Sequence, residues 1–111
     1  MANPNALPSG FAMLKATTTQ QALALDPDRM YWLAHCGKTD AGADSDTPVY
    51  FAADDDVTAT PAEGGNKLVL STNLILAVGP GVRTLYFKLN AAAGDEPVFM
   101  IGATAPKMGQ W

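Results

Sequence analysis

The chain has 111 residues, of which 48% are hydrophobic and 16% charged. A disordered acidic chain would be poorer in apolar residues, so this composition favours a single folded domain. Seven basic residues stand against eleven acidic ones, giving a net charge of -4. The basic residues are scattered along the chain, which argues against nucleic acid as a partner.

Targeting and redox signals are sparse. Cys36 is the only cysteine, so neither an internal disulfide nor a thiolate metal cluster can form. No run approaches the roughly twenty apolar residues of a membrane span, and we expect no membrane partner. Residues 1–10 lack the basic region and continuous apolar stretch of a secretion signal. We therefore expect the protein to stay in the compartment that makes it.

The N-terminal ten residues are rich in proline and asparagine, which disfavours both helix and sheet. They are predicted to form a flexible arm. Leu7 lies in this arm, and Phe11, Met13 and Leu14 follow it. These apolar residues either cover the core of their own domain or contact a neighbouring subunit, and we take them as candidate partner-contact residues.

The first half of the domain is predicted to form short strands. Residues 11–19 predict one strand and residues 21–25 a second, although alanine content leaves a helix possible over 18–25. Residues 29–36 alternate between two faces that are both fairly apolar, which predicts a central strand covered on both sides. Trp32 is then expected in the core.

The second half follows the same pattern. A polar loop over residues 37–47 precedes a strand over 48–53, and a second long loop contains a weak strand at 57–60. Residues 68–78 predict two short strands separated by a bend at Thr72 and Asn73. The remaining predicted strands cover residues 82–89 and 97–102, and alternation over 82–89 turns three side chains inward, Leu85, Phe87 and Leu89.

Seven to eight short strands at this spacing, without a segment that demands a long helix, predict an all-β fold. We expect an antiparallel β-sandwich or a jelly-roll-like barrel over residues 11–105. Residues 106–111 form a C-terminal tail, in which Met108 and Trp111 are further candidate partner-contact residues.

The best chemical candidate is the acidic loop that contains Asp40, Asp44 and Asp46. Oxygen ligands at this spacing in a glycine-containing loop can wrap a calcium ion, together with the aspartates at 54–56. The order of residues differs from that of an EF-hand, and a solvated acidic loop explains the same residues. We expect no metal and no cofactor, with these three aspartates as weak calcium candidates.

Catalytic residues are not indicated. His35 is the sole histidine and adjoins Cys36, but neighbouring residues of a strand point to opposite faces and cannot form a nucleophilic pair. The acidic loops lack the rigid, partly apolar setting that paired catalytic carboxylates need. We expect a non-enzymatic protein.

Carbohydrate binding remains an alternative. A β-sandwich becomes a sugar-binding module when exposed aromatic side chains form a stacking platform. Five aromatic residues are candidates for such a platform: Tyr31, Trp32, Tyr50, Tyr86 and Trp111.

Three segments carry a resemblance to a known group of proteins. They are Thr-Pro-Val-Tyr-Phe-Ala-Ala at 47–53, Gly-Gly-Asn-Lys-Leu-Val-Leu at 64–70 and Val-Gly-Pro-Gly-Val-Arg-Thr-Leu-Tyr-Phe-Lys-Leu at 78–89. Over residues 16–105 the chain resembles small structural proteins of tailed bacteriophages, most closely the capsid decoration or cement proteins. These segments are strand and turn patterns, so the resemblance transfers no site residues.

The resemblance implies a virion protein on the outer capsid surface, made in the host cytoplasm. Its partner would be the major capsid protein, whose neighbouring copies it would hold together, and it would itself form a homo-oligomer. The alternative is a carbohydrate-binding or receptor-contacting module of a virion fibre.

Overall fold

The computed structural model describes residues 11–53 and 68–104. Within them lie eight strands and no helix: β1 (Phe11–Lys15), β2 (Gln21–Ala24), β3 (Tyr31–Thr39), β4 (Val49–Ala52), β5 (Leu68–Leu70), β6 (Ile75–Val78), β7 (Thr84–Lys88) and β8 (Pro97–Ala103). The predicted strand at 57–60 falls outside the described residues, as do the arm and the tail.

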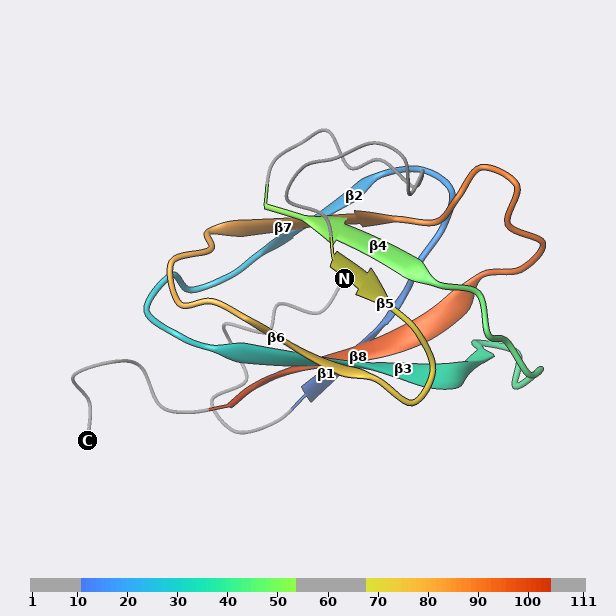
Figure 1. Cartoon of the computed structure of the whole chain (residues 1–111), viewed down its shortest axis with the longest axis horizontal. Coiled ribbons are helices and arrows are strands. Elements are labelled where there is room, and N and C mark those ends of the chain that lie inside the picture. The colour runs from blue at the N-terminus through green and yellow to red at the C-terminus, as the bar shows by residue number, and fades with distance from the viewer. Residues whose placement is uncertain (1–10, 54–67, 105–111) are drawn as a thin grey trace.

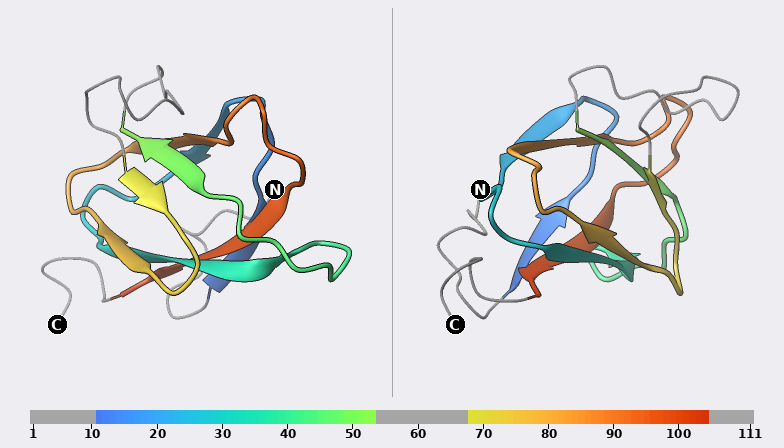
Figure 2. Two further views of the ribbon diagram at one scale, coloured as in Figure 1. Left: turned by 45° about the vertical axis from the view of Figure 1, so that its right-hand side comes forward. Right: turned by 60° about the vertical axis from the view of Figure 1, so that its left-hand side comes forward.

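The strands form two antiparallel sheets of four that lie face to face (Figures 1 and 2). The first sheet has the order β1-β8-β3-β6 and the second the order β2-β7-β4-β5. The chain therefore pairs like one long folded hairpin: β1 pairs with β8, β2 with β7, β3 with β6 and β4 with β5. Successive pairs belong alternately to the first and the second sheet. This is the strand order of a jelly roll, so the predicted all-β sandwich is confirmed.

Strand boundaries follow the local sequence. The predicted bend in residues 68–78 is confirmed, because Asn73 adopts a positive φ of 65° between β5 and β6. β1 is shorter than predicted and ends at Lys15. The threonines after it instead form a turn, in which the Thr17 hydroxyl donates to the carbonyl of Thr19 and accepts from its amide.

Three phenylalanine rings fill the centre of the sandwich. Phe51 and Phe87 come from the second sheet and Phe99 from the first, and all three are fully buried. Their ring centroids lie 5.0–5.9 Å apart, with both contacts to Phe99 edge to face. Such pairs add about 0.5–1.5 kcal/mol each beyond the area they bury. The predicted inward positions Leu85, Phe87 and Leu89 are confirmed as buried.

One end of the sandwich is closed by a tight glycine turn. Gly79 has a φ of +89°, and a Cβ added there would lie 2.6 Å from the backbone oxygen of Arg29. The next glycine, Gly81, also has a positive φ, and its amide donates to the carbonyl of Pro27 at 2.7 Å. The loop before β3 and the loop after β6 are thereby held together.

We predict that Gly79→Ala lowers the free energy of unfolding by about 3 kcal/mol, since it combines an unfavourable φ with a backbone clash. Gly81→Ala is the matched control, because its φ is equally unfavourable but a Cβ would meet nothing within 4 Å. Urea denaturation of both variants measures the difference. Equal losses would show that the contact with Arg29 is unimportant.

Candidate functional site

The outward side of the first sheet is apolar. Across its strands, Phe11 lies beside Gly102, which lies beside Trp32 and then Ala77. Two residues further along each strand, a second row of outward-facing residues crosses the sheet. It contains Met13, Met100, Ala34 and Ile75. We call these eight residues the outer face. None of them is charged.

Much of the outer face is exposed in the isolated chain. Phe11 is 54%, Met13 57% and Ile75 71% exposed. A contiguous apolar surface rimmed by polar residues is typical of a protein interaction site. Methionine adds side chains that adapt to irregular partners.

Trp32 lies on this face and not in the core, so its predicted position was wrong. Alternation along β3 turns Tyr31 and Leu33 inward, where they are 1% and 0% exposed. The Trp32 indole instead crosses β8 at Gly102 and reaches Phe11, with ring centroids 6.2 Å apart. Gly102 is required there, since a Cβ would come within 2.7 Å of the indole.

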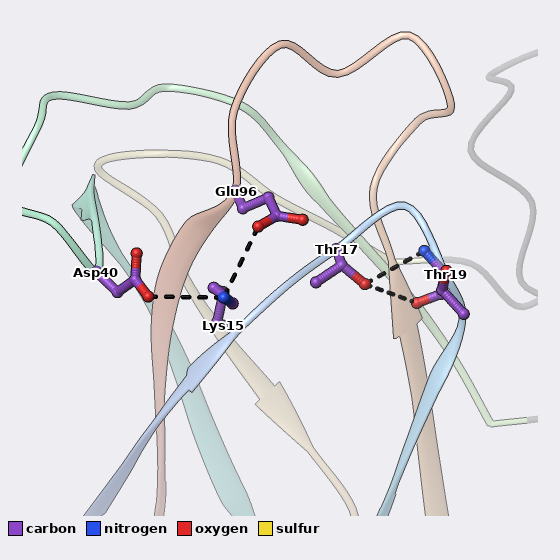
Figure 3. Close-up of polar contacts among 5 residues, drawn as sticks. All are labelled: Lys15, Thr17, Thr19, Asp40 and Glu96. Atoms are coloured by element: carbon purple, nitrogen blue, oxygen red, sulfur yellow. Dashed lines mark hydrogen bonds and ion pairs between the residues drawn. The ribbon is translucent and has the colours of Figure 1, made fainter.

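Charged residues border the face at one end of β1 (Figure 3). The Lys15 ammonium lies 3.6 Å from a carboxylate oxygen of Asp40 and 3.8 Å from one of Glu96. All three side chains are at least 45% exposed, so these pairs contribute little to stability. The two carboxylates offset the positive charge of Lys15, the residue of β1 that follows the apolar side chains.

A pocket of about 410 Å³ adjoins this border, between Met13 and Val98 on one side and Cys36, Lys38 and Asp40 on the other. Burial raises the pKa of the Cys36 thiol above its usual value. Less thiolate is therefore present at neutral pH, which lowers the reactivity of this cysteine.

His35 has a structural role. The amide of Gly37 donates to its Nδ1 at 2.9 Å, so Nδ1 carries no proton, and Nε2 donates to the carbonyl of Thr47 at 2.8 Å. Both ring nitrogens are thus engaged with backbone. His35 lies opposite Phe99 in the sheet, whereas Cys36 lines the pocket on the outer side, and this arrangement matches the divergence predicted for the two side chains.

Of the three candidate aspartates in the acidic loop, Asp44 and Asp46 line one pocket together with Ser45, whereas Asp40 lines another. Asp44 pairs with Lys38, which holds the pKa of that carboxyl below its ordinary value. Asp40 pairs with Lys15, and Asp46 is exposed. No three acidic, histidine or cysteine side chains gather in a metal-binding group in residues 11–53 and 68–104.

Other polar groups of the loop hold it in place. Ser45 is only 6% exposed, and both its hydroxyl and that of Thr47 donate to a carboxylate oxygen of Asp95. This cluster ties the β3–β4 connection to the loop before β8.

The predicted partner-contact residues divide into three groups. Phe11 and Met13 lie on the outer face. Leu14 is 7% exposed and belongs to the core, because alternation in β1 turns it opposite to Met13. Leu7, Met108 and Trp111 lie outside the described residues. Sequence reasoning missed Ile75 and Met100, and the signal that could have found them is the run of outward apolar positions on four neighbouring strands.

The four candidate aromatic residues that the structure describes do not lie on one surface. Tyr31 is in the core, and Trp32 lies on the first sheet. Tyr50 and Tyr86 cluster together on the second sheet, while Trp111 is outside the described residues.

Comparison of the chain with protein-family models, with curated proteins and with solved structures found no match. In the described part of the chain there is no candidate for a membrane-spanning helix.

We predict that Gly102→Ala displaces the Trp32 indole and costs about 1–3 kcal/mol of stability by overpacking. The indole N–H signal of Trp32 in NMR spectra and urea denaturation report the two effects. Gly94→Ala is the control, because a Cβ there meets nothing within 4 Å. If the chemical shift of the Trp32 indole N–H were the same in Gly102→Ala as in the unaltered chain, the described packing would be contradicted.

We also predict that Cys36 reacts with a thiol reagent several-fold more slowly in the folded protein than in the urea-unfolded chain at pH 7. The raised pKa and partial burial of the thiol both act in this direction. The rate should increase as the pH is raised. Equal rates in both states would show that the thiol is freely accessible.

Proposed function

We propose that this chain is a decoration protein of a tailed-phage head, which stabilises the capsid by binding across neighbouring major capsid proteins. The pattern of strands and turns supports the phage virion class through the resemblance described above. The filled interior supports a structural role, because the three phenylalanine rings occupy the space between the sheets.

The observation that carries the proposal is one corner of the first sheet. Phe11 begins β1 and lies opposite Gly102, near the end of β8. The two ends of the described domain, Phe11 and Thr104, therefore lie at the same corner, beside the exposed side chains of Phe11 and Met13. Thr104 is fixed there, because its amide and hydroxyl both donate to the carbonyl of Met30, at 2.9 and 3.1 Å.

The binding mechanism is burial of apolar surface. Each copy would cover Phe11 and Met13 against a junction between capsid proteins, together with contacts from residues 1–10 and 106–111. A single contact of this kind is modest, but the capsid presents the same junction many times. Binding of one protein to several subunits raises the overall affinity through effective concentration.

We predict that the double variant Phe11→Ser, Met13→Ser binds phage heads at least about tenfold more weakly, which corresponds to about 1.4 kcal/mol. The assay is co-sedimentation of the purified chain with heads of the phage that encodes it. Ala22→Ser is the control, since Ala22 is exposed on β2 of the second sheet.

Truncation of residues 1–10, or of 106–111, should weaken sedimentation with heads as well. If the unaltered chain did not sediment with heads at all, the decoration proposal would be wrong. Binding to a glycan array in the absence of head binding would instead favour the carbohydrate-binding alternative.

A further inference from the structure

β5 and β6 leave two open strand edges on the same side of the sandwich. β5 is the last strand of the second sheet and β6 the last strand of the first, and the short connection 71–74 joins them (Figure 2, yellow and light orange). Each is paired on one side only among the described strands. Backbone groups of an open edge are available to a further strand.

This border lacks the usual protection of open edges. Residues 68–82 contain no charged side chain, whereas natural sheets guard exposed edges with charges, especially lysine. Four large aliphatic residues are exposed there instead: Leu68 at 40%, Val69 at 37%, Leu74 at 41% and Ile75 at 71%.

The opposite side of the sandwich differs. Its edge strands are β1, which ends at Lys15 with two carboxylates nearby, and β2, which begins at Gln21. Of the two edges of the first sheet, β1 therefore carries a charged residue and β6 carries none, which makes β6 the edge better suited to pair with a copy of itself.

We propose that a second copy of this chain docks on the β5–β6 border, with the β6 strands of the two copies paired antiparallel about a twofold axis. In a twofold interface the same surface patch of both copies is buried, so the patch must be complementary to itself. A patch bearing charge would repel its copy, and this patch bears none although the chain carries -4 overall. An identical β6 edge also supplies the backbone groups that the first copy leaves open.

Side-chain alternation restricts how the two β6 strands can align. Ile75 and Ala77 face outward and Leu76 and Val78 inward, and residues paired across the axis must share a face. Centring the axis on Leu76 places Ile75 opposite Ala77 of the second copy, a large side chain against a small one. The first sheets then join into one sheet of eight strands.

The size of the patch sets the strength of this contact. At the exposures given above, the four aliphatic side chains present on the order of 300 Å² of apolar surface, below the roughly 800 Å² per partner of a standard interface. We therefore expect a dimer that forms and dissociates with protein concentration. The inference does not depend on the proposed capsid function, because it concerns the free protein.

Sedimentation velocity of the full chain at about 1 to 500 µM tests the proposal, without any capsid present. The expected result is a shift from monomer toward dimer in the upper part of this range, as for a weak, transient interface. A monomer at every concentration would overturn the proposal, and so would an assembly that grows beyond a dimer.

The variant Ile75→Lys should shift the dissociation constant at least about tenfold, because it places two like charges beside the axis. Ala24→Lys is the matched control, since Ala24 is exposed at the end of β2 on the other side. Circular dichroism verifies that each variant is folded. If Ile75→Lys unfolds, Leu74→Lys is used as the test variant in its place. A dimer that resists the lysine in a folded variant would overturn the assignment to this border.

Discussion

The contact among Phe51, Phe87 and Phe99 is the constraint on which the rest of the structure depends. It joins two strands of the second sheet to β8 of the first, and β8 is also the strand that holds β1 and β3 together. With β8 fixed in this way, its alternate residues must face outward. The position of the outer face is therefore a consequence of the core, since the same strand supplies both.

The strands were predictable because their signals are local. Glycine, proline and aspartate clusters mark most of the strand ends, and the bend at Asn73 follows from residues that tolerate a positive φ. The order β1-β8-β3-β6 was not predictable from the sequence. It depends on pairing between residues as distant as Phe11 and Gly102, and alternation within one strand carries no information about its neighbour.

The site was predicted only in part, for a related reason. Alternation separates the two faces of a strand but does not say which of them is covered. In β3 both faces are apolar, so Trp32 and Tyr31 were equally suited to the core, and the smaller residues on the neighbouring strands decide the outcome. Gly102 leaves room for the indole outside, whereas Tyr31 packs inside. In β1 the same rule separates Met13 from Leu14, although the sequence presents them as one apolar run.

The ion pairs of Lys15 have a consequence for the kind of assembly that this chain can build. A sheet with two unguarded edges can add copies at both ends and extend into a filament, because every added copy presents a fresh edge. Here Lys15, with Asp40 and Glu96 beside it, places charge at the end of β1 and leaves β6 as the uncharged edge of that sheet. An association through one edge is complete with two copies. In the dimer proposed above, this difference between the two edges of the sheet limits the assembly to two copies and prevents polymerisation.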